Sequence, residues 1–234
     1  FTFGYLWRVR RLLGEEHTLG DVDLRSHVLN VSHGFLNGDR VTAYAYLLDF
    51  DNPAMLASST KSFGVSYDGG IDVGTQRLFY RGEYADQSDY GDNPNSIDAW
   101  YANVELGWRF TNQWVLTAGN ERLSGDGRFA FQTPLATLHK FNGFADIFAT
   151  GTPPTGLEDY YVRASVPILG ARFNAAWHNF RADEGDARYG EELNVELNWR
   201  LNSHWMVGAK YADYQAKDLA VDTRKAWLWV EASF

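Results

Sequence analysis

The sequence of this chain contains the same hairpin pattern twice: a short polar turn between two segments in which apolar and polar residues alternate. The first copy runs from Asn103 to Trp114 and the second from Asn194 to Trp205. In the first strand of each copy, apolar side chains alternate with polar or charged ones. A period of two is the signature of a strand with one apolar and one polar face. Tryptophan stands on both sides of each turn, at Trp108, Trp114, Trp199 and Trp205.

Several features favour a membrane-spanning barrel over a soluble antiparallel sandwich, which also alternates. The strands are about ten residues long, enough to cross a hydrocarbon core when tilted. The end of the chain, 226–234, alternates and closes on Phe234, which resembles the insertion signal of bacterial outer-membrane barrels and predicts the barrel-assembly machinery as a partner. We expect the four tryptophans and Phe234 at one membrane interface, where indole rings are typical.

The composition agrees with this prediction. Apolar residues make up 45% of the chain and its mean hydropathy is −0.37, with 16% aromatic residues. Membrane barrels combine a thin apolar band with a polar lumen, so their mean hydropathy stays low. The chain has no cysteine, which excludes disulfides and zinc–thiolate sites. The net charge of −9 argues against nucleic acid as a partner.

Alternation and turn residues together predict about twelve strands. They fall near 1–12, 24–36, 40–50, 60–68, 75–85, 98–110, 114–123, 159–166, 171–181, 192–201, 205–215 and 225–234. Short turns alternate with longer loops, as in outer-membrane barrels. We therefore predict an all-β, transmembrane, antiparallel up-and-down β-barrel in the bacterial outer membrane. It forms a single domain over 1–234 with a long inserted loop at 124–158, and lipid bilayer and lipopolysaccharide surround it.

The apolar stripe assigns the two faces of the sheet. It sends residues such as Tyr44, Tyr46 and Leu48 outward, and it leaves a charged face for the lumen. The basic residues predicted on that inner face, as lumen or selectivity residues, are Arg8, Arg10, Arg77, Arg81, Arg109, Arg163, Arg172, Arg200 and Lys210, with Lys225 beside them. Fewer acids share it: Asp49, Glu83, Glu105, Glu121, Glu196 and Glu231. Most negative charge, including Glu191 and Glu192, is assigned to loops.

Two interpretations of the inner arginines stay open and are compatible. The arginines can form cross-strand ladders with the glutamates. Any surplus positive charge lowers the barrier for anions in a low-dielectric channel.

The segment within 124–158 is too apolar for a free surface loop. A loop of this length in a compact fold is usually functional or disordered, and its phenylalanines argue against disorder. We therefore expect it to fold inward, or to pack on the rim, as a constriction. The residues assigned to this constriction are Phe131, Phe141, Asn142, Phe144, Asp146 and Phe148.

This loop, with the segments 44–52 and 156–162, resembles the bacterial alginate-export family of outer-membrane channels. The run 133–143, Thr-Pro-Leu-Ala-Thr-Leu-His-Lys-Phe-Asn-Gly, is the specific part of the resemblance. The family implies an eighteen-stranded barrel with an arginine-rich, anion-conducting bore that passes acidic polysaccharide outward. The chain is then either a smaller relative of about twelve strands or the C-terminal part of a longer barrel.

The leading functional hypothesis is a channel for anionic small molecules or acidic polysaccharide such as alginate. An outer-membrane enzyme of the lipid hydrolase type is the first alternative. Such an enzyme needs a serine and a histidine in reach of each other, but the adjacent pair Ser32-His33 lies on a predicted strand, where neighbours point to opposite faces. The histidines show no metal-ligand spacing, so we expect no catalytic residues, metal or cofactor. The second alternative is a structural or adhesive barrel with an occluded lumen, favoured by inward Phe79, Phe180, Trp227 and Trp229.

Overall fold

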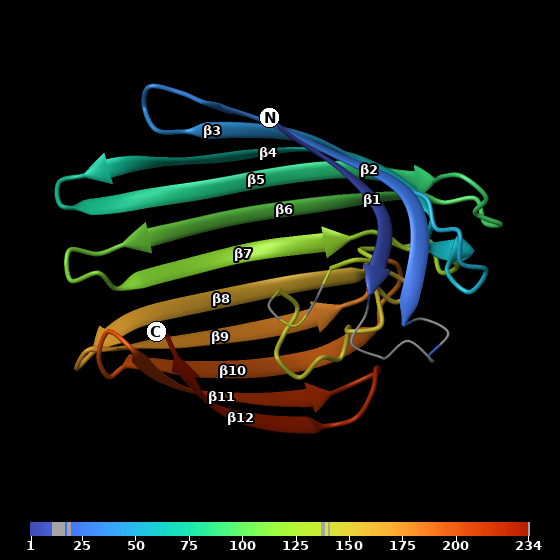
Figure 1. Ribbon diagram of the computed structural model, residues 1–234. Coiled ribbons are helices and arrows are strands. Elements are labelled where there is room, and N and C mark those ends of the chain that lie inside the picture. Colours follow the sequence, from blue (N-terminus) through green and yellow to red (C-terminus); the bar gives the residue numbers. More distant parts are fainter. Residues whose placement is uncertain (11–16, 18–19, 137–138, 140, 234) are drawn as a thin grey trace.

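The computed structural model describes residues 1–10, 17, 20–136, 139 and 141–233, and within them twelve strands form one antiparallel sheet in chain order (Figure 1). The strands are β1 (Thr2–Arg10), β2 (Asp21–Gly34), β3 (Arg40–Leu48), β4 (Thr60–Val73), β5 (Gln76–Asp89), β6 (Asp98–Arg109), β7 (Val115–Leu123), β8 (Leu157–Ile168), β9 (Ala171–Arg181), β10 (Arg188–Arg200), β11 (Trp205–Ala216) and β12 (Thr223–Ala232). A short 3₁₀ helix, η1 (Leu56–Ser58), precedes β4. No described helix is long and apolar enough to cross a membrane. The predicted all-β, up-and-down arrangement is confirmed.

Short and long connections alternate between the two ends of the sheet. The turns 35–39, 74–75, 110–114, 169–170 and 201–204 lie at one end, and the longer loops 49–59, 90–97, 124–156, 182–187 and 217–222 at the other (Figure 1). Asn112 and Asn202 close two of the short turns by accepting hydrogen bonds from the N–H groups of Trp114 and Trp205 at 3.2 and 3.0 Å. The asymmetry matches outer-membrane barrels, whose short turns are periplasmic.

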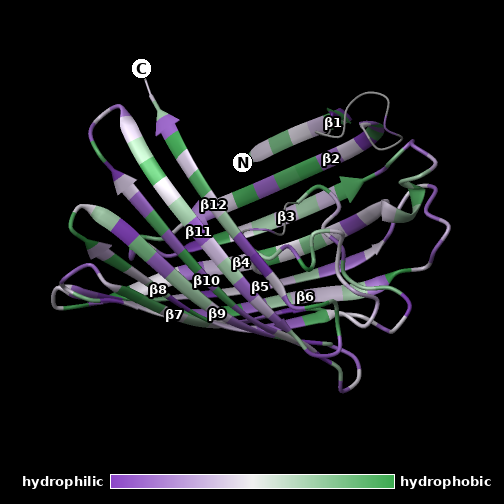
Figure 2. Ribbon diagram, turned by 90° about the horizontal axis from the view of Figure 1, so that it is seen from below, coloured by the Kyte–Doolittle hydropathy of each residue, from purple (hydrophilic) through white to green (hydrophobic). Residues whose placement is uncertain are grey.

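The sheet curls without closing on itself. Among the described residues β1 pairs only with β2, and β12 only with β11. Figure 2 shows a curved trough with β1 and β12 at its two rims. The hydrogen-bonding groups on the outer sides of these two strands are therefore open sheet edges.

The convex face carries apolar side chains that no described element covers. On β6 and β12 these include Val104 at 65%, Leu106 at 55%, Leu228 at 86% and Val230 at 65% exposure. A continuous exposed apolar band of this kind marks a membrane or partner surface. It is the band that a barrel presents to lipid.

The outward assignment of Tyr44, Tyr46 and Leu48 is wrong. Tyr44 donates a hydrogen bond of 2.8 Å to Glu83 on the concave face. Leu48 is buried and belongs to a small apolar cluster that also contains Leu24 of β2. The physical reason is that both faces of β3 are apolar: Val41, Ala43, Ala45 and Leu47 alternate with the tyrosines. Alternation then defines two faces but does not say which one is lipid-facing.

Inward aromatic rings lie over glycines on the neighbouring strand. A Cβ at Gly64, Gly107, Gly119 or Gly208 would overlap the ring of its cross-strand partner, respectively Tyr44, Phe79, Tyr161 and Trp229. Pairing an aromatic ring with a facing glycine is a known device for stabilising strongly curved sheets. These rings therefore lie flat on the wall instead of projecting into the bore.

Candidate lumen constriction

The strand register arranges the concave face in rows. One row joins Arg109, Val115, Ser165, Asn174, Glu196 and Lys210 across β6 to β11, each residue being the register partner of the next. The next row towards the long loops contains Thr117, Arg163, Ala176 and Asn194. Because side chains alternate along each strand, both rows face the same side.

Most of the inner cations have carboxylate partners. Arg81 bridges Asp68 and Glu83, each at 2.5 Å, and Arg77 binds Asp72 at 3.0 Å. Arg163 pairs with Glu105, and its guanidinium lies 4.6 Å from the centre of the Tyr161 ring. These contacts are the cross-strand ladder that the sequence left as one interpretation.

Lys210 is held less tightly than the arginines. Its Nζ atom lies 3.8 Å from Glu196, 4.7 Å from the centre of the Phe144 ring and 5.7 Å from that of Trp229. Arg172 donates to the neutral Ser165 at 3.1 Å and has no carboxylate within 4.0 Å among the residues that the structure describes. Arg109 and Arg200 lie near the short turns, and neither has a described carboxylate within 4.0 Å.

Arg8 and Arg10 do not belong to the lumen face. A register shift between Leu6 and Arg8 inverts the alternation of β1. Beyond it, Arg8 binds Asp23 at 2.6 Å and Arg10 approaches Asp21 at 3.7 Å. Both aspartates alternate with the buried Val22 and Leu24 of the concave face, so both arginines point to the convex side. A single bulge, which period-two reasoning ignores, accounts for the error.

The long loop between β7 and β8 folds onto the concave face. Phe148 is buried at 1% exposure, with its ring 4.9 Å from Phe180 and 6.0 Å from Tyr189. Phe131 packs 5.6 Å from Tyr101. Asn142 donates to Glu121 Oε2 at 2.6 Å. Apolar and polar contacts therefore fix the loop at several strands.

The tip of the loop turns sharply at two residues with left-handed backbone angles, Gly143 at φ 90° and Asp146 at φ 61°. Glycine and aspartate tolerate this conformation better than other residues. Asp146 accepts hydrogen bonds from Lys225 at 2.8 Å and shares a 2.6 Å contact with His139 Nδ1. Burial raises the pKa of Asp146, but these two partners outweigh it and hold the pKa below the ordinary 3.8.

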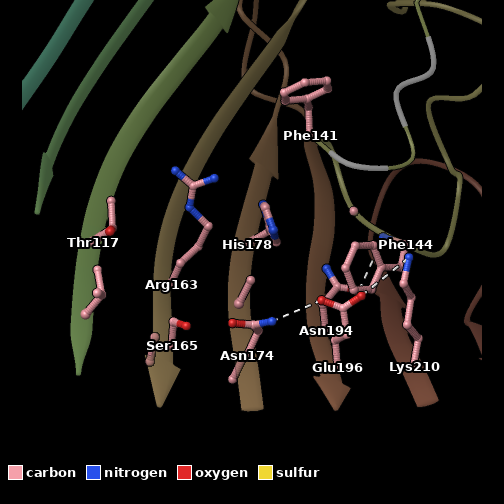
Figure 3. Close-up of a pocket in the computed structure, with 15 residues that line it drawn as sticks. Thr117, Phe141, Phe144, Arg163, Ser165, Asn174, His178, Asn194, Glu196 and Lys210 are labelled. Atoms are coloured by element: carbon pink, nitrogen blue, oxygen red, sulfur yellow. Dashed lines mark hydrogen bonds and ion pairs between the residues drawn. The ribbon is translucent and has the colours of Figure 1, made fainter. Parts of the chain in front are cut away.

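Cavities lie on both sides of the loop tip. A cavity of about 540 Å³ is lined by Phe144, Arg163, His178 and Lys210, among others, and Figure 3 shows these side chains converging on it. A second cavity of about 520 Å³ is lined by Tyr44, Tyr46, Tyr101, Glu83 and Glu121. Phe141, which is 54% exposed, lines both. The loop tip thus separates a basic cavity from an acidic, aromatic one.

Three buried wall residues under the loop were not predicted as site residues. Glu192 and Asn194 of β10 are 1% and 2% exposed, and His178 of β9 binds Asp159 of β8 at 2.8 Å. Glu192, which was counted with the loop charges at the start of the predicted strand 192–201, lies within β10 in phase with the inward Glu196. Extending that alternation from Glu196 by two and by four residues would have found Asn194 and Glu192, respectively.

The four tryptophans predicted to lie at a membrane interface are all at the short-turn end of the sheet. Trp108 lies near the end of β6 and Trp114 is the last residue of the turn 110–114, and Trp199 and Trp205 lie on either side of the turn 201–204. Trp114, Trp199 and Trp205 are 49%, 47% and 42% exposed, and Trp108 donates its indole N–H to Gln76 at 2.6 Å. Phe234, the fifth predicted interface aromatic, lies outside the described residues. Among the described side chains no cluster could hold a metal ion.

No family model and no curated protein matches this chain. Solved structures do match at 12–16% identity, which shows a shared fold. OccK10 (OpdN) of Pseudomonas aeruginosa has 16% identity and a TM-score of 0.70 over 97% of this chain and 67% of its own. OccAB4 of Acinetobacter baumannii has 16% identity and a TM-score of 0.70 over 91% of this chain and 54% of its own. The outer membrane protein OpdK of P. aeruginosa has 13% identity and a TM-score of 0.68 over 88% and 56%.

The fold is therefore that of the Occ outer-membrane barrels, in agreement with the predicted outer-membrane location. The resemblance to the alginate-export family is not supported by these comparisons. The chain spans 60%, 59% and 61% of the length of three further matched structures, OccK11, OccK5 and OccD1. The open sheet of the described residues thus corresponds in fold to part of those barrels.

Proposed function

We propose that this chain forms most of the wall, and the constriction, of an outer-membrane channel for small anionic solutes. The observation that carries the proposal is the basic cavity beside the inward-folded loop. Lys210 and Arg163 line it together with one carboxylate, Glu196, which lies 3.8 Å from Lys210 and is the one carboxylate within 4.0 Å of it among the described residues. A cation in a low-dielectric bore lowers the barrier for anions.

Barrel closure is part of the proposal. Unpaired backbone groups cost several kcal/mol each in lipid, so β1 and β12 require strand partners in a bilayer. Antiparallel strands, beyond the twelve described, supply the hydrogen bonds at these two edges. The length of the matched structures leaves room for such strands.

The flat-lying aromatic rings favour a conducting lumen over an occluded one. Phe79 and Trp229 lie over Gly107 and Gly208, so neither ring fills the bore. An enzymatic function receives no comparable support. His178 contacts Asp159 and aromatic rings, and among the described residues no serine or threonine hydroxyl bonds to it, whereas hydrolysis needs a nucleophile in reach of the base.

Single-channel recording of the complete protein in planar bilayers tests this function. Reversal potentials in a salt gradient should give an anion-to-cation permeability ratio above one. The Lys210→Met variant should lower that ratio, while Lys217→Met, in the loop 217–222, is the matched control. A cation-selective wild-type channel, or the absence of current, would contradict the proposal. Current block by alginate oligomers, but not by small carboxylates, would instead favour a polysaccharide channel.

A further inference from the structure

The structure shows which wall residues hold the loop tip. Glu192 Oε1 accepts a hydrogen bond of 2.8 Å from the N–H of Ala145, and Asn194 Oδ1 accepts one of 3.2 Å from the N–H of Phe144. Both acceptors come from β10, two residues apart, and both side chains are almost fully buried. The backbone of the tip, not only its side chains, is thus bound to one strand.

The contact at Gly143 shows how closely the tip fits this strand. A Cβ at Gly143 would overlap the Glu192 carboxylate, and its φ of 90° disfavours other residues. Glu192 Oε2 is buried, and no described group donates a hydrogen bond to it. Burying a carboxylate oxygen without a hydrogen-bond donor costs free energy of folding. Such a group therefore points to a specific role for its remaining contact, here the hydrogen bond to the loop tip.

The position of Phe144 determines how Lys210 meets the cavity. Phe144 follows Gly143 directly, and its ring centre lies 4.7 Å from Lys210 Nζ. Figure 3 shows the Phe144 ring next to the Lys210 side chain at the edge of the basic cavity. Contact with an aromatic face partly satisfies a cation, so the ring competes with a passing anion for Lys210.

We propose that Glu192 is a positioning residue for the constriction: with Asn194 it fixes the loop tip so that Phe144 covers Lys210. This inference rests on the proposed channel function. It predicts that Glu192, which does not touch the solute, controls both the conductance of the channel and the access of anions to Lys210. A purely structural Glu192 would affect folding alone.

The experiment compares four substitutions in the complete protein, reconstituted in planar bilayers after heat-resistant gel migration has confirmed a folded barrel. Glu192→Ala should raise the single-channel conductance and the anion-to-cation permeability ratio, because the tip is released and Lys210 is uncovered. Phe144→Ala should produce the same two changes. Glu192→Gln keeps an acceptor oxygen and should lie nearer to wild type than Glu192→Ala. Glu191→Gln, on the opposite face of the same strand, is the matched control.

A double variant provides the decisive comparison. If Glu192 acts through Phe144, the Glu192→Ala/Phe144→Ala channel should match the single variants in permeability ratio instead of summing their shifts. Additive shifts, or a Glu192→Ala channel identical to wild type, would overturn the inference.

The Gly143→Ala variant should displace the loop tip from the Glu192 carboxylate by changing the loop instead of the strand. It is used in place of Glu192→Ala if the Glu192→Ala protein does not fold. A wild-type protein without anion-selective current would refute the proposed function itself. An anion-selective wild type with unchanged Glu192→Ala and Gly143→Ala channels would refute only the positioning role.

Discussion

The ring of Tyr161 lies directly over Gly119, its cross-strand partner between β7 and β8, and its hydroxyl donates a hydrogen bond of 2.9 Å to Glu105. The pair lets a large side chain reach the next carboxylate along the wall without entering the bore. Glu105 also binds Arg163, so the glycine indirectly supports a cation of the basic cavity.

Gly119→Ala should destabilise the barrel and disturb this contact. The added methyl group overlaps the Tyr161 ring, and overpacking of this kind costs about 1–3 kcal/mol. The temperature at which the folded band is lost on gels should fall. Gly82→Ala on β5 is the control, because a Cβ there meets nothing within 4 Å. Equal losses in both variants would show that the ring can move aside.

Deleting residues 130–150 should raise conductance and leave the barrel folded. The backbone hydrogen bonds of a membrane barrel are made between strands, not by this loop. Single-channel recording and heat-resistant migration measure the two effects. Unchanged conductance with a folded barrel would place the loop outside the permeation path.

Charge reversal at Arg109 and Arg200 should shift selectivity towards cations. These residues occupy equivalent positions in the two repeated hairpins, near the short turns, and each reversal changes the local charge by two units. Reversal potentials in a salt gradient measure the shift. Arg8→Glu is the matched control, since Arg8 pairs with Asp23 on the convex face. An equal shift in the control would mean that lumen position is irrelevant.

Acid should loosen the loop tip through Asp146. The pKa of this carboxyl is depressed in the folded state, so its stabilising contribution is complete above the ordinary value of 3.8 and is lost as the pH falls through the lower folded value. Open-channel noise should rise on acidification below about pH 3.8. Asp146→Asn should show the higher noise already at neutral pH and little further change. A wild-type response identical to that of the variant would exclude Asp146 as the titrating group.

Amide hydrogen exchange tests barrel closure. In the complete protein, the outward-edge N–H groups of β1 and β12 should exchange as slowly as those of β6 and β7, because further strands pair with them. Exchange of these edge amides as fast as that of the long loops would show that the edges stay open.

The strands could be predicted because a strand with one face toward lipid and the other toward the lumen alternates apolar and polar residues with a period of two. Face assignments failed where this signal is degenerate or interrupted. Tyr44 and Tyr46 share β3 with an equally apolar opposite face, and the bulge after Leu6 turned Arg8 and Arg10 outward. Loop contacts such as Ala145 with Glu192 join residues far apart in the chain, and no local pattern encodes them.

The loop between β7 and β8 and the strands that it contacts belong to one continuous stretch of the chain. The loop's hydrogen bonds and ring contacts among the described residues reach β5–β7 and β9–β12, and none of these is to β1. The constriction can therefore dock while the two rims of the trough are still apart. During folding, the loop therefore does not have to be threaded into an already closed barrel. The width of the constriction is fixed before the barrel closes.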